Sequence, residues 1–122
     1  MTTQEIANKW ANYCSTGQSE KAYQELYHQN CISLEVPGVQ GYPERAEGMA
    51  AIMEKGKQWG DMIEAFHGME IEGPIVAGNY FTATMKMDIT MKGQERRVDE
   101  EVGVYKVEDG KIVQEQFFYS VG

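Results

Sequence analysis

Apolar residues recur at a helical spacing in the first half of the chain and at a strand spacing in the second half, with the change near residue 61. In the first half, side chains three or four positions apart form apolar stripes that predict helices over 3–15, 20–28 and 44–59. Between the last two helices, the sequence CISLEV predicts a short strand over 31–36. Two glycines and two prolines in the next segment, 37–43, predict a loop.

After residue 61, alternating apolar and polar residues predict four strands, over 62–78, 80–93, 96–107 and 112–121. Short turns join these strands, and consecutive strands joined by short turns pair antiparallel. The helices, which all come earlier in the chain, must then cover one face of the sheet. The sequence therefore predicts an α+β fold in which a strongly bent antiparallel sheet wraps around three N-terminal helices.

Length and charge limit the classes of partner. The 122 residues fit a single domain, expected over 1–122. A formal net charge of −8 repels phosphate groups and anionic lipids, so we expect neither nucleic acid nor a membrane as partner. The chain has no run of 18 apolar residues, and its first ten residues lack the basic start and apolar segment of a signal peptide. Two cysteines, expected to be reduced, favour a cytoplasmic protein.

Motifs for metals and cofactors are missing from the sequence. The two histidines, His28 and His67, lie far apart and form no HxH or HxxxH pattern, so we expect no metal site. No glycine-rich loop follows a strand and opens a helix, which gives nucleotide binding no support. We therefore expect a protein without a cofactor.

Three stretches carry a likeness to a known family: ANYCSTGQSEKAYQELYHQNCISLEVPG at 11–38, EGMAAI at 47–52 and VYKVEDGKIVQEQFFY at 104–119. In their order and spacing they resemble the nuclear transport factor 2-like superfamily, and within it the SnoaL-like and ketosteroid-isomerase-like branch. The resemblance implies a cone-shaped α+β barrel with an apolar pocket between the sheet and the helices. It also implies a homodimer formed through the outer face of the sheet. Members of the superfamily include isomerases, polyketide cyclases, dehydratases and proteins that only bind, so fold alone does not give function.

Alternation along each strand predicts which side chains face the pocket. In the Met-rich strand, Met85 and Met87 are on the apolar face and should line the cavity. His67 shares a face with Met69 and Ile71, which predicts that it points inward.

The last two strands are placed with the help of the resemblance. It puts Glu115, Phe117 and Tyr119 inward, and the same reasoning puts Glu101 inward together with Gly103. An alternative stays open for the two glutamates: they could instead pair on the outside with basic residues, namely Arg96, Arg97 or Lys111.

Glu35 is the main candidate for chemistry. The resemblance places it where ketosteroid isomerases hold their general base, at the end of the first strand, and a carboxylate in a dry cavity has the raised pKa that this work needs. The alternative is a solvated acid beside a loop. The donors of that enzyme's oxyanion hole are absent, because Trp10 stands at the tyrosine position and Gly103 at the aspartate position. His67 could act with Glu35 as a catalytic pair, or could be a neutral histidine packed in the wall.

Two hypotheses follow for function. The first is a pocket protein that binds an apolar polyketide-like or steroid-like ligand without turnover. The alternative is a cofactor-free isomerase or cyclase that uses Glu35 as general base. In both, Trp10, Tyr119 and the methionines form the walls of the site. A Glu35 close to His67 across a closed cavity would favour chemistry, and a Glu35 in water would exclude it.

Overall fold

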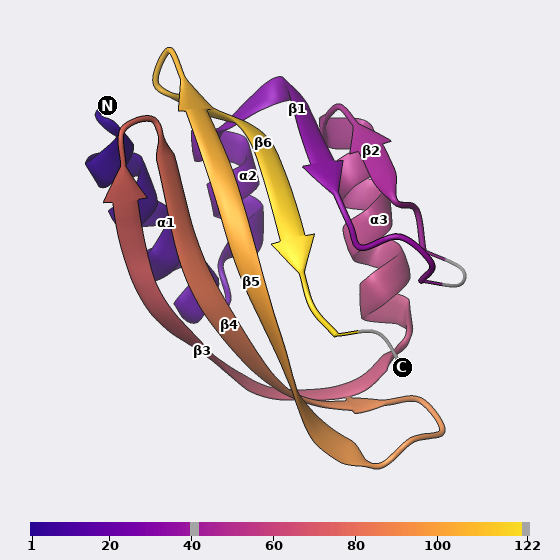
Figure 1. The fold of residues 1–122 in the computed structure, drawn as a ribbon. Coiled ribbons are helices and arrows are strands. Elements are labelled where there is room, and N and C mark those ends of the chain that lie inside the picture. The colour runs from indigo at the N-terminus through magenta and orange to yellow at the C-terminus, as the bar shows by residue number, and fades with distance from the viewer. Residues whose placement is uncertain (40–41, 121–122) are drawn as a thin grey trace.

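The computed structural model describes residues 1–39 and 42–120. Its helices are α1 (Thr3–Ser15), α2 (Ser19–Leu26) and α3 (Met49–Asp61). Its strands are β1 (Tyr27–Leu34), β2 (Arg45–Glu47), β3 (Ile63–Ala77), β4 (Tyr80–Met91), β5 (Arg96–Glu108) and β6 (Lys111–Phe118). Figure 1 shows the three helices on one side of a strongly bent sheet, which confirms the predicted α+β fold class.

The six strands form one open sheet in the order β2-β1-β6-β5-β4-β3. The consecutive strands β3, β4, β5 and β6 pair antiparallel with one another, as their short turns predict. Strand β1 pairs parallel with β6, so the sheet as a whole is mixed. No short turn joins these two strands, because most of the chain separates β1 from β6. The consequence is that the end of β1 lies beside β6, and residues from both can meet.

Several boundaries differ from the prediction, among them the start of the first strand, which is Tyr27 and not residue 31. Helix α2 ends at Leu26 because Tyr27 already has an extended backbone, with φ −97° and ψ 140°. Helix α3 begins at Met49, since Gly48 has a φ of 85° and the three residues before it pair with β1 as strand β2. The predicted last strand extends to Val121, which lies outside the described residues.

An aromatic cluster fills the closed end of the fold, where α1 meets β4 and β5. Trp10 is buried, and its ring lies 4.5 Å from that of Tyr105 and 5.6 Å from that of Phe81, measured between centroids. Phe81 and Tyr105 stack with centroids 4.6 Å apart. Large buried aromatic rings contribute much of the stability of a domain this small. The cluster therefore fixes one end of the space between helices and sheet.

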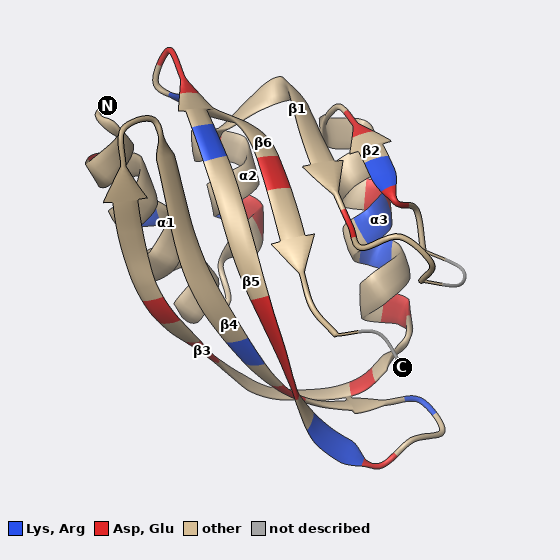
Figure 2. Ribbon diagram, viewed as in Figure 1, with Lys and Arg blue, Asp and Glu red and all other residues tan. Residues whose placement is uncertain are grey.

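Charged residues mark the opposite end of the sheet. Acidic and basic positions lie close together on the β4–β5 hairpin (Figure 2). Arg96 pairs there with Asp88 across the two strands, and Arg97 pairs with Asp99. Both arginines are thus paired with aspartates of this hairpin. In the described residues, no helix is long and apolar enough to cross a membrane.

Candidate functional site

A cavity of about 1420 Å³ lies between the concave face of the sheet and the helices. Most of the predicted site residues line it: Trp10, Glu35, Met85, Met87, Glu101, Glu115, Phe117 and Tyr119. Further aromatic side chains, among them Tyr42 and Trp59, add to its walls. Met85 on β4, Glu101 on β5 and Glu115 on β6 are each less exposed than the residues on either side, as the predicted alternation requires, while the roles of these residues in binding stay predictions.

Glu35 follows the end of β1 and turns its side chain inward. Its backbone N–H donates to the carbonyl of Glu44 at 2.8 Å, which extends the pairing with β2 by one step. Only 7% of the side chain is exposed. The alternative of a solvated acid is therefore wrong.

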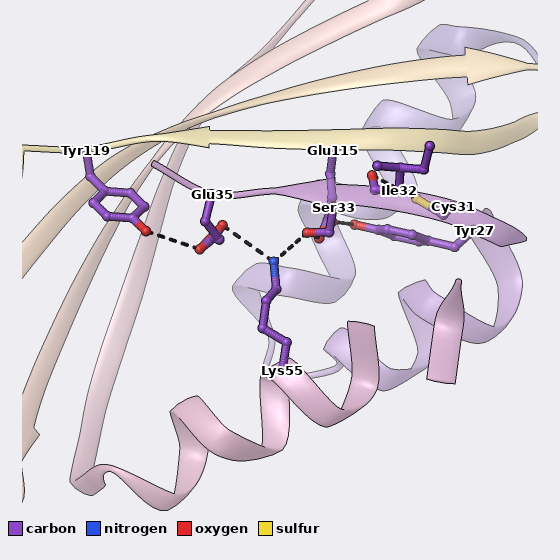
Figure 3. Close-up of polar contacts among 8 residues, drawn as sticks. All are labelled: Tyr27, Cys31, Ile32, Ser33, Glu35, Lys55, Glu115 and Tyr119. Carbon is purple, nitrogen blue, oxygen red and sulfur yellow. Dashed lines mark hydrogen bonds and ion pairs between the residues drawn. The ribbon is translucent and has the colours of Figure 1, made fainter. Parts of the chain in front are cut away.

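The two oxygens of Glu35 have different surroundings (Figure 3). The hydroxyl of Tyr119 donates to Oε1 at 3.4 Å, whereas Oε2 lies 3.5 Å from the Lys55 nitrogen and accepts no hydrogen bond. Burial raises the pKa of the Glu35 carboxyl, and the nearby Lys55 and the Tyr119 hydroxyl partly oppose that rise. Burial also raises the pKa of Tyr119 to about 12, so that this hydroxyl keeps its proton and can donate.

Lys55 was not predicted as a site residue. In the structure it is buried, and only 5% of its surface is exposed. It lies one helical turn after Ile52 on the inward face of α3. Its ammonium donates to the Ser33 hydroxyl at 2.5 Å and lies 5.4 Å and 5.8 Å from the ring centroids of Phe117 and Tyr42. These are cation–π distances. The buried charge is thus held by a carboxylate, a hydroxyl and two rings.

Ser33 connects Lys55 to a second buried carboxyl. The Ser33 hydroxyl donates to Glu115 Oε2 at 2.7 Å, and the Tyr27 hydroxyl donates to Oε1 at 2.6 Å. Burial raises the pKa of Glu115, and the hydrogen bonds from Tyr27 and Ser33 partly oppose it. Glu115 therefore faces inward, and the alternative of an outer ion pair is wrong. Ser33 is fully buried, so its contact with Lys55 serves the network and does not expose a nucleophile.

Glu101 also faces inward, opposite Met85 on β4. Burial raises the pKa of its carboxyl to about 7, and the nearby carboxylates of Glu35 and Glu115 add to the rise. The basic residues proposed as outer partners are occupied elsewhere: the two arginines pair with aspartates, and Lys111 donates to the carbonyl of Glu25. At the next inward position, a Cβ on Gly103 would lie 2.7 Å from the Tyr105 hydroxyl. The Tyr105 side chain thus occupies the space that a side chain at position 103 would need.

His67 does not belong to this site. It is exposed on β3, and its Nε2 lies 2.9 Å from the Thr90 hydroxyl. The pairing of β3 with β4 shifts between Phe66 and Gly68, so that His67 is an extra residue in the ladder. The bulge puts the residues on either side of it toward the cavity instead. The predicted inward orientation of His67, and with it the predicted Glu35–His67 pair, is wrong.

Comparisons with known proteins agree with this geometry. The family model of the SnoaL-like domain matches residues 1–119. The chain belongs to the SnoaL-like family. A solved structure from Mesorhizobium loti, named as a candidate SnoaL-like polyketide cyclase, is 33% identical with a TM-score of 0.88, over 98% of this chain and 100% of the other.

More distant structures share the SnoaL-like fold. A ketosteroid isomerase-like protein from Catenulispora acidiphila is 21% identical with a TM-score of 0.74, over 98% of this chain and 88% of that one. A nuclear transport factor 2-like protein of unknown function from Burkholderia pseudomallei is 11% identical with a TM-score of 0.82, over 98% and 92%. At these identities the likeness concerns the fold alone. No curated protein matches the sequence.

Within this SnoaL-like domain, the cavity combines apolar walls with groups that exchange protons. Glu35 can accept a proton, Tyr119 can donate a hydrogen bond, and Lys55 places a positive charge between them and the core. The described residues contain no cluster of three or more His, Cys, Asp or Glu placed to hold a metal ion, and Cys14 and Cys31 are free thiols. The arrangement suits transfer of protons on a bound molecule.

Proposed function

We propose that the cavity binds a small, largely apolar carbonyl compound and that Glu35 removes a proton from the carbon next to the carbonyl. The observation that carries the proposal is the state of the Glu35 carboxyl, which is buried in the cavity wall with one oxygen free of hydrogen bonds. That oxygen faces the Lys55 ammonium at 3.5 Å and is shielded from water, whereas Oε1 meets the Tyr119 hydroxyl at 3.4 Å, so the carboxyl is held in the wall with few hydrogen bonds to weaken it as a base. Because burial raises its pKa, this carboxylate is also a stronger base than a solvated one.

The proposed reaction needs only groups that the chain supplies. Glu35 takes the proton, the electron pair of the broken C–H bond forms a C=C bond, and the carbonyl π pair moves to oxygen as an enolate. The ammonium of Lys55, 3.5 Å from Glu35, favours the ionised base before the transfer and stabilises the negative charge of the site. Return of the proton from Glu35 to another carbon completes an isomerisation. In a ring closure, the enolate carbon instead bonds the carbon of a second carbonyl, whose π pair moves to oxygen, and that alkoxide takes the proton from Glu35.

The walls indicate the class of ligand. Aromatic rings and methionines surround the polar groups, and methionine side chains adapt to irregular apolar shapes. The likeness to the Mesorhizobium loti protein, named as a candidate polyketide cyclase, supports a polyketide-like compound over a steroid-like one.

Binding without turnover is the second candidate function. It is favoured by the positions of Trp10 and Gly103, which stand where the resemblance implies a tyrosine and an aspartate. A preorganised donor of this kind contributes about 3 kcal/mol to transition-state stabilisation. The cavity and the ligand class are the same in both candidate functions. The two differ in whether Glu35 removes a proton from the bound ligand.

We also propose a cytoplasmic homodimer that pairs through the outer face of the sheet. The apolar side chains exposed on β5 and β6 support this surface: Val98, Val102 and Phe118. Val102 and Phe118 are direct neighbours across the two strands, which makes the patch continuous.

A thermal-shift screen of apolar carbonyl compounds tests the proposed binding. A ligand at a hundredfold excess over its Kd adds about 2.7 kcal/mol of stability, which raises the Tm by several degrees. We expect hits whose shift in wild type is reproduced in the exposed control Glu64→Gln and altered in Glu35→Gln. Equal shifts in all three proteins would place the ligand away from Glu35 and contradict its role as base. A screen without hits would contradict the ligand class.

A further inference from the structure

Glu101 is a carboxyl of β5 that lines the cavity. Among residues 1–39 and 42–120, no side chain makes a hydrogen bond or an ion pair with it. Glu35, in contrast, has Lys55 and Tyr119, and Glu115 has Tyr27 and Ser33. The Glu101 carboxyl lines the cavity and is thus available to a bound molecule.

The strand places this carboxyl in the same space as Glu35. On β5, the inward positions are every second residue, and Gly103 follows Glu101 on that face. Because Gly103 has no side chain and Tyr105 fills that space, Glu101 is the inward group on β5 that extends beyond the aromatic cluster. The Glu101 carboxyl therefore looks into the cavity and not into the core.

We propose that Glu101, in its protonated form, is the acid of the site: it donates a hydrogen bond to the carbonyl oxygen of the ligand, and gives that oxygen its proton as Glu35 removes the carbon proton. This inference rests on the proposed function and deepens it. Trp10 and Gly103 stand where the resemblance implies the two hydrogen-bond donors of an oxyanion hole. Glu101, two residues before Gly103 on the same face of β5, then supplies a donor from a longer side chain.

The charges around the two carboxyls divide the roles between them. The groups that face Glu101 are Glu35, Glu115 from β6, Lys55 from α3 and Asp99 on its own strand. Burial is the main reason that the pKa of Glu101 rises to about 7, and the three acids among these four groups add to the rise, so that its neutral form is favoured. Glu35 lies against Lys55, which favours its ionised form. Two carboxyls whose surroundings differ in this way suit an acid and a base.

The proton transfers balance without any other reactant. Glu35 gains the proton of the carbon, and the C–H electron pair forms a C=C bond. The carbonyl π pair bonds the proton of Glu101, so the products are an enol, a protonated Glu35 and an ionised Glu101. The reverse transfers, to the same or to another carbon, restore both carboxyls.

The test uses 2,4-dinitrophenolate, which stays ionised over the whole pH range and imitates the enolate oxygen. Binding is measured with the Glu35→Gln variant, because its amide imitates the protonated base and removes the titration of Glu35 from the pH profile. We expect the affinity of Glu35→Gln for the phenolate to fall about tenfold per pH unit above neutrality, because a bound oxyanion needs the proton of Glu101. The double variant Glu35→Gln/Glu101→Gln keeps an N–H donor, so its affinity should stay constant with pH.

Matched variants separate the outcomes. Glu35→Gln/Glu64→Gln changes an exposed glutamate that does not line the cavity and should behave as Glu35→Gln, whereas Glu35→Gln/Glu101→Leu should bind weakly at every pH. Circular dichroism of each variant verifies its fold. The same pH dependence of binding in Glu35→Gln and in Glu35→Gln/Glu101→Gln would overturn the role of Glu101 and leave Glu35 as base. Failure of the phenolate to bind wild type and Glu35→Gln alike would overturn this inference and the proposed function together.

Discussion

Replacing Lys55 by methionine should lower the free energy of unfolding by about 3–5 kcal/mol at pH 8. Lys55 is 5% exposed and is the cation that faces the buried Glu35. Without it, Glu35 keeps an uncompensated buried charge, and Ser33 loses its donor. At about pH 5 the loss should shrink, because Glu35 then takes up a proton and needs no cation.

Urea denaturation of wild type and Lys55→Met at both pH values measures this effect. Lys57→Met changes an exposed lysine of the same helix and should stay within about 0.5 kcal/mol of wild type. The double variant Lys55→Met/Glu35→Gln removes both charges and should recover part of the loss. A loss for Lys55→Met that does not depend on pH, or that Lys57→Met equals, would contradict a buried Glu35–Lys55 pair.

Lowering the pH from about 8 to about 5 should raise the free energy of unfolding. Burial raises the pKa of Glu35, Glu101 and Glu115 in the folded state, so in this window the folded chain binds more protons than the unfolded one. The penalty for charging them is fully present above the folded pKa and is relieved as the pH falls toward their ordinary value. For Glu101, a rise from 4.5 to about 7 corresponds to roughly 3 kcal/mol.

Surface carboxylates reverse the trend at still lower pH. Hydrogen bonds from partners lower the pKa of Glu5, Glu25 and Asp88, so the stability that these groups add is lost as the pH falls through their folded values. Chemical denaturation across the range should therefore give a maximum on the acid side of neutrality. In Glu101→Gln, the free energy of unfolding should change less with pH above that maximum, and at pH 8 it should be higher than in wild type. A stability that rises with pH between 5 and 8 would contradict the burial of these three acids.

Elements in which apolar residues recur at a regular spacing over many positions could be predicted from the sequence. Helix α1 and strands β3 to β6 lie within a few residues of their predicted limits, because each is long and is bounded by residues that favour turns. Strand β2 has three residues and one buried side chain, Ala46, so its pairing with β1 is a tertiary effect with no local period. The predicted third helix therefore began too early, at residue 44 instead of 49.

The candidate site was predictable where strand alternation continues without interruption. This holds for Glu101 on β5 and for Glu115 on β6, both of which face inward. It fails at His67, where an extra residue in the β3–β4 ladder reverses the faces and no residue type announces the bulge.

Lys55 was missed for a different reason. Its position one turn after Ile52 was a usable signal, but a lysine on a helix is ordinarily assigned to the solvent side. Only the fold brings it to Glu35 and Ser33, which come from a distant part of the chain.

Exchange of carbon-bound protons for deuterium on a small cyclic ketone, such as 2-tetralone, is the most direct measurement of Glu35 as a base. Proton NMR in deuterated buffer follows the loss of signal at the carbon next to the carbonyl. Wild type and the exposed control Glu64→Gln should both accelerate exchange over buffer, and Glu35→Gln should lose about 10²–10⁴-fold of that acceleration. Exchange at the buffer rate in wild type, or an equal acceleration in Glu35→Gln, would contradict proton removal by Glu35.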